Sequence, residues 1–466
     1  MNKDLRSFLE KIKKLGPDHF VTVSKELDTK YEPCVIQQKL AHEKKFPVIY
    51  CERMKGSKLP LITNLFGSYE LLGLALGIDP GKPKSDILKV FREKFERPVP
   101  VKEIPKAKAP VKEIVLKGKD ADLGVLPIVH HAEKDSAKYI TPGCLISKDP
   151  DTGKINVGMY RHELQGKNLL GSMFNPAHHG AYIYRRYKEL NKPMEAVIFL
   201  GHHPAVVMGA LVRSQVSEME VMGSFLGEPL EVTRAETVDI PVPACAEIAI
   251  EGVLYPDKET GDGPFAEYTG YYGPAKRPVP LFQVKAITMR KNAIFHDLDP
   301  AHREHVVSGV LAYESSVYET VQKLVPSVQG VHMPPSGVCV LSAYVAIKKR
   351  VAGEGKSAGL AALSAEPNLK MIVVVDDDID IYNEEQVIWA IVTRMEADIG
   401  LTMIPHILGA HLDPSAYGEV RTEKGPMQTK LILDATRPVS LPFAERIFPP
   451  KDAWNRMRLE DYVNKR

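Results

Sequence analysis

The chain of 466 residues is too long for one small domain, and at roughly 150 residues per domain it predicts about three domains. Its 61 basic residues nearly balance its 59 acidic residues, which argues against nucleic-acid or membrane-surface partners, because such partners are bound by a clustered basic face. Five scattered cysteines without a CxxC spacing predict neither a disulfide framework nor a zinc site, and favour a reducing, cytoplasmic location. No run of about 18 uncharged apolar residues predicts a membrane span.

Residues 1–115 are predicted to form an α/β domain. Leu5, Phe8 and Ile12 recur at helical spacing, FPVIYCER is typical of a strand, and SYELLGLALG and DILKVFREKF are typical of helices, the first of them ending at Gly77. The tract RPVPVKEIPKAKAP holds too many prolines for a regular helix. Together with the lysines that follow, it is interpreted as a solvated linker.

Residues 116–310 consist of short strand-like runs separated by Gly, Pro, Asn and Asp, a pattern that predicts a β-barrel or sandwich. One helix, GAYIYRRYKELNK, directly follows His178 and His179, so this pair lies at a helix N-terminus, where free N–H groups favour anions such as phosphate. In residues 311–466 the strand MIVVVDDDID is followed by the helix NEEQVIWAIVTRM, which predicts a second α/β domain.

Potential metal ligands stand in two separate stretches. Asn156, either His178 or His179, and Glu218 offer an amide oxygen, an imidazole and a carboxylate, which suit manganese or magnesium. The alternative is that all of them are ordinary surface residues. Spacing alone does not separate the two interpretations.

An arginine and two carboxylates form a second candidate group. Asp262 and Glu267 flank a GPFA turn, and Arg161 beside them would hold one carboxylate ionised while burial raises the pKa of the other. On an unbroken strand Arg161 and Asn156 point to opposite faces, because five residues separate them. The alternatives are a surface ion pair and a solvated acidic turn.

Two further clusters are weaker candidates for metal binding. His202 and His203 follow the apolar run AVIFL and are interpreted as its end, and Asp376, Asp377 and Asp378 are interpreted as an acidic loop after a strand. The chain has no GxxxxGK[ST] loop, no GxSxG elbow and no HExxH motif. The usual nucleotide-binding, serine-hydrolase and zincin functions therefore have no support.

Five motifs taken together resemble the UbiD family of prenylated-FMN-dependent decarboxylases, in particular its furan and pyrrole carboxylate branch. They are NVGMYR, NPAHHG, VSEMEVMGSFLGEPLEV, EGVLYPDKETGDGPFAEYTGYYG and KLILDATRP, and they occur in family order over nearly the whole chain. The resemblance implies an N-terminal α/β domain (1–115), a central split β-barrel that binds the cofactor (116–310) and a C-terminal α/β oligomerisation domain (311–466).

The same resemblance implies a metal and a cofactor. Asn156, His179 and Glu218 match the family's ligands for Mn²⁺, which bridges to the cofactor phosphate and is accompanied by K⁺. The positions that match the family's cofactor contacts are Asn156, Met159, Tyr160, Arg161, Met173, Phe174, Asn175, His178, His179, Glu218 and Lys430.

The family's catalytic network carries over to Asp262, Arg161 and Glu267, with Glu267 as the proton donor. Many relatives have Glu where this chain has Asp262, and the shorter aspartate is expected to have less reach toward Arg161. The resemblance implies a reversible non-oxidative decarboxylation, in which the prenylated flavin forms a covalent adduct with the unsaturated acid, carbon dioxide leaves, and the protein returns a proton.

The stretch FHDLDPAHREH favours a polar substrate over an apolar acrylic acid, because it offers the side chains of His296, His302, Arg303 and His305. We predict a furan or pyrrole carboxylate. For furan-2,5-dicarboxylate, Arg303 with His296 would bind the second carboxylate. The alternative is that these side chains pair with the acidic residues of the same loop.

Three other functions remain open. The chain could decarboxylate a phenolic or cinnamate-like acid, it could be a flavin-free metal-dependent hydrolase, or it could be a non-catalytic flavin-binding subunit. The expected partners are a flavin prenyltransferase that supplies the cofactor and further copies of the chain, as a dimer or an assembly of dimers. The polar, proline-punctuated tail after residue 440 could embrace such a copy.

Overall fold

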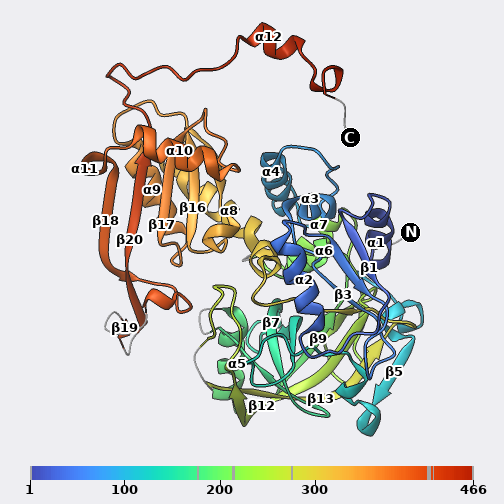
Figure 1. The fold of residues 1–466 in the computed structure, drawn as a ribbon. Helices are drawn as coiled ribbons and strands as arrows, with labels where there is room; N and C mark the ends of the chain where they lie inside the picture. The colour runs from blue at the N-terminus through green and yellow to red at the C-terminus, as the bar shows by residue number, and fades with distance from the viewer. Residues whose placement is uncertain are drawn as a thin grey trace.

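The computed structural model describes residues 3–175, 178–212, 216–273, 277–416, 421–422 and 425–463. Figure 1 shows an N-terminal unit lying against a β-barrel, and a second sheet with its helices set apart from both, with one long helix between. The predicted architecture of α/β unit, central barrel and second α/β unit is confirmed. No helix among the described residues is both long and apolar enough to cross a membrane.

The N-terminal unit is a small sheet with four helices. Its first helix buries Leu5, Phe8, Leu9 and Ile12 along one face, as the spacing predicts. The strands, in sheet order, are β1 (Phe20–Val23), β2 (Val48–Cys51), β3 (Leu61–Thr63) and β14 (Phe295–His296). The helices are α1 (Leu5–Lys13), α2 (Glu32–His42), α3 (Tyr69–Ala75) and α4 (Lys84–Phe95). Strand β14 comes from the region that the sequence assigns to the central domain.

The central barrel is closed because its longest strand, β12, pairs with both the next strand and the last strand of the row that runs around the barrel. The strands in order around it are β12 (Ile248–Asp262), β9 (Met194–Leu200), β6 (Tyr139–Lys148), β7 (Ile155–Gly166), β8 (Leu169–Ser172) and β13 (Arg277–Met289), with β5 (Ile114–Lys117) added to β13. Its helices are α5 (His179–Glu189), α6 (Pro204–Gly209) and α7 (Glu218–Leu226), and a side sheet holds β4 (Lys102–Glu103), β10 (Glu231–Arg234) and β11 (Pro241–Pro243).

The lysine-rich tract after residue 100 is not the solvated linker that the sequence predicts. Strand β4 pairs with β10, and β5 pairs with β13 of the barrel. Lys112 is buried and lies 2.8 Å from Glu251, and Lys117 lies 2.8 Å from Glu236. Lys112 and Lys117 therefore form ion pairs with glutamates of the barrel, and these ion pairs hold the tract against the barrel wall.

The C-terminal unit begins with a helix of 22 residues, α8 (Arg303–Leu324), and continues as a mixed sheet. Its strands, in order, are β15 (Val328–His332), β16 (Ser342–Ile347), β17 (Met371–Asp376), β20 (Gly425–Ala435) and β18 (Leu401–Leu408), with β19 (Arg421–Thr422) on β20. The helices are α9 (Glu354–Ala365), α10 (Glu384–Arg394), α11 (Ala397–Gly400) and α12 (Lys451–Arg456). As predicted, Asn383 caps α10, its side chain accepting from the backbone N–H groups of Glu385 and Gln386.

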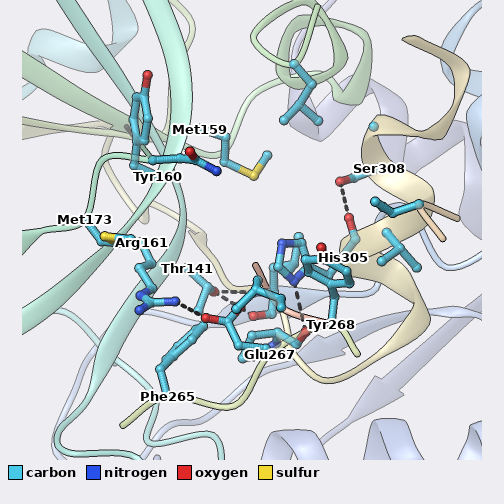
Figure 2. A pocket seen from close by; sticks show the side chains of 18 of the residues that line it. Thr141, Met159, Tyr160, Arg161, Met173, Phe265, Glu267, Tyr268, His305 and Ser308 are labelled. Atoms are coloured by element: carbon cyan, nitrogen blue, oxygen red, sulfur yellow. Dashed lines mark hydrogen bonds and ion pairs between the residues drawn. The ribbon is translucent and has the colours of Figure 1, made fainter. Parts of the chain in front are cut away.

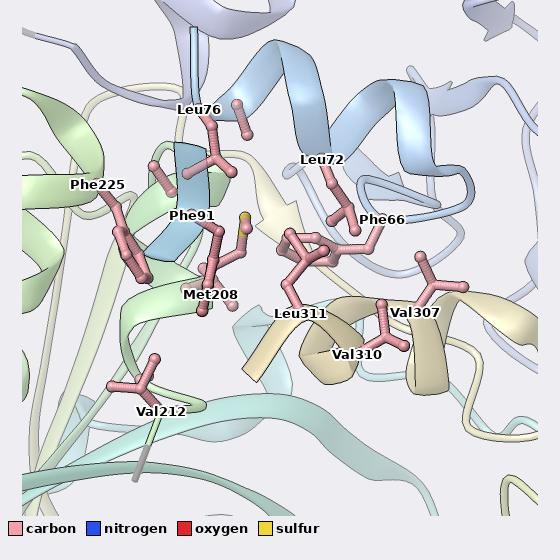
Figure 3. Packing of buried hydrophobic residues seen from close by; sticks show 14 of the residues in the cluster. Phe66, Leu72, Leu76, Phe91, Met208, Val212, Phe225, Val307, Val310 and Leu311 are labelled. Atoms are coloured by element: carbon pink, nitrogen blue, oxygen red, sulfur yellow. The ribbon is translucent and has the colours of Figure 1, made fainter. Parts of the chain in front are cut away.

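One hydrophobic cluster joins parts of all three units. Val307, Val310 and Leu311 on α8 pack toward N-terminal residues and toward residues of the central helices (Figure 3). The other residues of the cluster that Figure 3 labels are Phe66, Leu72, Leu76, Phe91, Met208, Val212 and Phe225. Helix α8 is therefore anchored along its apolar face, and its first turn is held in a fixed position.

We predict that Leu72→Ala destabilises the protein far more than Leu360→Ala. Leu72 is fully buried in this cluster, whereas Leu360 on α9 is 48% exposed, and both lie within helices, so the change in helix propensity is matched. The buried truncation should lower the free energy of unfolding by about 2–5 kcal/mol. Urea unfolding followed by circular dichroism measures the difference, and equal midpoints for the two variants would contradict this packing.

Candidate active site

A cavity of about 360 Å³ lies where the barrel meets the first turns of α8 and the C-terminal unit. Figure 2 shows residues of β7 and Met173, which follows β8, on one side of it, with Glu267, Tyr268, His305 and Ser308 facing them. The C-terminal unit contributes Val340, Asn368, His411 and Leu412. The remaining lining residues are Thr141, Met159, Tyr160, Arg161, Met173, Asn175, His178, Leu211, Phe265, Arg277, Leu298, Pro300, Val306, Gly309 and Tyr313.

Arg161 stands between the two predicted carboxylates. Its Nη2 lies 2.6 Å from Oδ2 of Asp262, and its Nη1 donates to Oε1 of Glu267. The guanidinium also stacks on the ring of Phe265, whose centroid is 4.3 Å from Cζ. Burial raises the pKa of the Glu267 carboxyl, and the charge of Arg161 opposes this shift.

The contact of Asp262 with Arg161 corrects the expectation from side-chain length. Asp262 is the last residue of β12 and is only 1% exposed, so its backbone already lies close to the site. The long side chain of Arg161 supplies the reach that aspartate lacks. The network of two carboxylates and one arginine is therefore complete with Asp262 in place of Glu.

A second hollow brings together Asn156, His179 and Glu218, the three predicted metal ligands. His179 begins α5, and Glu218 begins α7 and is 6% exposed. Burial raises the pKa of Glu218 to about 7. Nδ2 of Asn156 is buried and has no hydrogen-bond partner among the described residues.

These residues fit a divalent cation. Glu218 is buried with no cationic partner among the described residues, and a metal ion would hold this carboxylate in its charged form. The described residues contain no group of three His, Cys, Asp or Glu side chains that could hold a metal, so the third ligand would be the amide oxygen of Asn156.

Strand β7 serves both hollows. Asn156 lines the smaller one, whereas Met159, Tyr160 and Arg161 line the larger cavity, so Asn156 and Arg161 reach different hollows because they stand at different points along the strand. Among the other predicted cofactor contacts, Met173, Asn175 and His178 also line the cavity.

Phe174 and Lys430 are predicted cofactor contacts that the structure places behind the cavity wall. The ring of Phe174 packs edge-on against Tyr160, with centroids 4.9 Å apart. Nζ of Lys430 donates to the carbonyl oxygen of Pro367 at 2.6 Å, and burial lowers its pKa. Both support residues of the lining, since Pro367 precedes Asn368.

The predicted substrate contacts His296 and Arg303 do not line the cavity. His296 is fully buried on β14, and the guanidinium of Arg303 lies over the ring of Phe46, 4.0 Å from its centroid. Of the four polar side chains that the sequence offers here, only His305 lines the cavity. The reason is helical geometry, because Arg303 and His305 stand at different angles on the first turn of α8.

The two weaker clusters have structural partners. His202 and His203 follow the end of β9, and the side chain of His203 caps α6 by accepting from Ala205 N–H. Asp376 and Asp378 both pair with Arg394, at 2.8 and 2.7 Å. The acidic loop is thus neutralised by arginine.

Several lining residues have no signal in the sequence. Thr141 and Arg277 belong to no motif that indicates a site, and they come together only because β6 and β13 are both strands of the barrel. Arg277 has no ion pair with a described residue, in contrast to Arg161. An unexplained arginine directly after the YTGYYGPAK stretch is the one hint that the sequence offers.

Three family models match successive parts of the chain. They are the N-terminal domain (residues 16–91), the Rift-related domain (102–302) and the C-terminal domain (306–435) of 3-octaprenyl-4-hydroxybenzoate carboxy-lyase. Together with the barrel and the arginine–carboxylate network, these matches define the class of protein. The chain belongs to the UbiD family of carboxy-lyases.

Relatives and solved structures agree with this assignment. Anhydromevalonate phosphate decarboxylase of Methanothermobacter thermautotrophicus is 32% identical over 438 residues, which cover 94% of this chain and 97% of that protein. The UbiD-class enzyme HmfF from Pelotomaculum thermopropionicum in complex with FMN has a TM-score of 0.91 at 34% identity, covering 99% and 100% of the two chains. An evolved dimeric form of HmfF in complex with prFMN has a TM-score of 0.87 at 32% identity, with the same coverage.

We predict that Arg161→Met makes stability strongly dependent on pH. Without the guanidinium, Asp262 and Glu267 repel each other in a buried place, so the folded-state pKa of the pair rises above its unfolded value. A carboxyl with a raised folded pKa adds stability below its unfolded pKa and loses it as pH rises through the folded pKa. The variant should therefore lose about 3–5 kcal/mol at pH 8 and markedly less near pH 5.

Differential scanning fluorimetry across this pH range measures the effect. Arg234→Met is the matched control, because Arg234 also pairs with two carboxylates, but at the surface with 54% of its side chain exposed. It should shift the melting temperature little at any pH. A pH-independent loss in Arg161→Met would mean that packing, and not charge, dominates at this position.

Proposed function

We propose that this chain catalyses the reversible, non-oxidative decarboxylation of an unsaturated, heteroaromatic carboxylic acid with prenylated FMN as cofactor. The observation that carries the proposal is Glu267, a buried carboxyl that lines the cavity and is held by Arg161. Burial keeps a carboxyl protonated more readily, and a carbon that has lost carbon dioxide needs a proton donor beside it.

The cofactor assignment rests on family membership and on the FMN and prFMN in the two HmfF structures. When bound, prenylated FMN supplies the sink for the electron pair that carbon dioxide leaves behind. Met159, Tyr160, Met173, Asn175 and His178 would hold it, since they line the cavity. The N-terminus of α5 would favour its phosphate.

Asn156, His179 and Glu218 would hold Mn²⁺ beside that phosphate, with K⁺ as a second cation. The donor set of amide oxygen, imidazole and carboxylate supports manganese. Such a cation would neutralise both Glu218 and the cofactor phosphate, which joins the two hollows into one site.

Asp262, Arg161 and Glu267 would each have a separate role in the reaction. Asp262 fixes the guanidinium of Arg161, and Arg161 in turn orients the Glu267 carboxyl toward the cavity. As the bond between the substrate carbon and its carboxylate breaks, carbon dioxide leaves and the bonding electron pair stays with that carbon. Glu267 then delivers its proton to that carbon and regains one from water.

The substrate predicted from the sequence is a furan or pyrrole carboxylate, with furan-2,5-dicarboxylate as the leading acid. A second candidate is a phosphorylated unsaturated acid, because the relative from Methanothermobacter thermautotrophicus is named an anhydromevalonate phosphate decarboxylase. Arg277 favours a second anionic group in either case. It lines the cavity and has no ion pair with a described residue, whereas Arg161 is already neutralised.

The remaining proposals concern partners and location. The C-terminal segment supports a homo-oligomer, since Figure 1 shows it leading away from the C-terminal sheet, and Ile447, Trp454 and Leu459 on it are 95%, 70% and 72% exposed. A flavin prenyltransferase would supply the cofactor. All five cysteines are buried and lie far apart in the sequence, which supports a reducing, cytoplasmic location.

The deciding experiment is co-expression with a flavin prenyltransferase, followed by a visible spectrum, cofactor mass and carbon dioxide release from a panel of acids. The panel holds furan-2,5-dicarboxylate, pyrrole-2-carboxylate, anhydromevalonate phosphate, and phenolic and cinnamate-like acids. Bound prenylated flavin with turnover is expected. Correctly folded protein without flavin would overturn the proposal in favour of a metal-dependent hydrolase, and flavin without turnover would favour a non-catalytic binding subunit.

We predict that Glu267→Gln lowers kcat by about 10²–10⁴-fold while prenylated flavin remains bound, because the amide cannot deliver the proton. Glu93→Gln, an exposed position on α4, is the matched control and should retain full activity. Single-turnover kinetics on the cofactor-loaded proteins measure the step directly. Unchanged kcat in Glu267→Gln would assign the proton donor elsewhere.

We predict that Glu218→Gln loses manganese, because the neutral amide is a far weaker ligand than the carboxylate. The affinity should fall by at least about tenfold, and bound flavin should fall with it. Glu220→Gln on the same helix is the control, since Glu220 does not line the hollow. Metal analysis of protein dialysed against limiting Mn²⁺ gives the answer, and equal metal content in both variants would exclude the site.

A further inference from the structure

The first turn of α8 presents hydrogen-bond acceptors to the cavity. His305 lines the cavity, and its Nδ1 lies 2.9 Å from the carbonyl oxygen of Pro300. A carbonyl oxygen can only accept, so Nδ1 carries the hydrogen and Nε2 is left with a lone pair. Burial lowers the pKa of His305, the hydrogen bond to Pro300 opposes this shift and the nearby charge of Arg161 adds to it, so the net direction favours the neutral ring.

Ser308 uses its hydrogen in the same way. Its Oγ lies 2.7 Å from the carbonyl oxygen of His305 and donates to it, one turn back along α8. Toward the cavity, Oγ can therefore only accept a hydrogen bond. Thr141 follows the same pattern, because its hydroxyl donates to the carbonyl oxygen of Leu298 at 2.6 Å. His305, Ser308 and Thr141 therefore each donate their side-chain hydrogen to a backbone carbonyl oxygen.

The direction of the His305 ring is fixed. The ring of Tyr268 packs edge-on against it, with centroids 5.7 Å apart and an interplanar angle of 89°. Figure 2 shows His305 and Ser308 on the side of the cavity opposite Met159 and Arg161. Among the residues that the structure describes, Nε2 of His305 has no hydrogen-bond partner, so an acceptor on a half-buried side chain faces the place where substrate would lie.

We infer that His305, assisted by Ser308, determines specificity by accepting a hydrogen bond from a donor group on the substrate, a hydroxyl or a ring N–H. The inference rests on the proposed function and narrows it. A carboxylate, an ether oxygen or a ring oxygen has no hydrogen to offer, so it would leave the acceptor unpaired and out of water. Within the predicted substrate class this ranks pyrrole-2-carboxylate above furan acids, which have the same ring size but no N–H.

Matched pairs of acids test the inference. In the cofactor-loaded enzyme, the acid of the panel that is turned over fastest is compared with its analogue in which only the donor is replaced, N–H by O or O–H by O–CH₃. The expected fall in kcat/KM is about 10- to 100-fold. A fastest acid that has no donor, or an equal kcat/KM within its pair, would overturn the inference.

Three variants assign the effect to the residue. His305→Phe should abolish the preference within the pair, and His305→Gln, which keeps an acceptor oxygen, should restore part of it. Ser308→Ala should reduce the preference less than His305→Phe does. His42→Phe, at an exposed position that ends α2, is the control for the substitution itself.

The outcomes separate the inference from the proposed function. A preference that survives in His305→Phe overturns the role of His305 even though the enzyme is a decarboxylase. If His305→Phe does not fold, His305→Gln and Ser308→Ala carry the same comparison. Protein that binds no prenylated flavin and releases no carbon dioxide overturns the proposed function, and the inference with it.

Discussion

The ion-pair network of Arg161 is the interaction on which the rest of the site depends. Its partners come from the end of β12 and from the loop that follows, so one guanidinium ties a barrel strand to the segment that carries Glu267. The buried guanidinium and the carboxylate of Asp262 neutralise each other, and burial raises the pKa of Glu267, so the network is tolerable out of water. The same pairing aims Glu267 at the cavity and leaves Arg277 as an arginine without a carboxylate partner in the described lining.

Helix α8 connects stability with specificity. Its apolar face joins the cluster that spans all three units, and its first turn forms a wall of the cavity. Because the helix is anchored by Val307, Val310 and Leu311, the positions of His305 and Ser308 follow from core packing and not from a flexible loop. The C-terminal unit completes the same cavity, so substrate contacts depend on how the units pack.

Strand β7 contributes to the two hollows at different points along its length. One end of the strand contributes Asn156 to the smaller hollow, and its middle contributes Arg161 to the larger one. The proposed cation and the proposed proton donor would thereby be kept apart, so the metal would not compete for Glu267. The cofactor phosphate would lie between them, near the N-terminus of α5.

The sequence by itself determined the family, the three-part architecture and the network of Arg161 with two carboxylates, because motifs and hydrophobic spacing are local properties. It misjudged the reach of Asp262, since reach depends on where β12 ends in space. It also chose His296 and Arg303 from a stretch in which only His305 lines the cavity. Which face of a helix meets a cavity, and where each hydrogen is donated, is decided by packing between units, and only the tertiary structure contains that information.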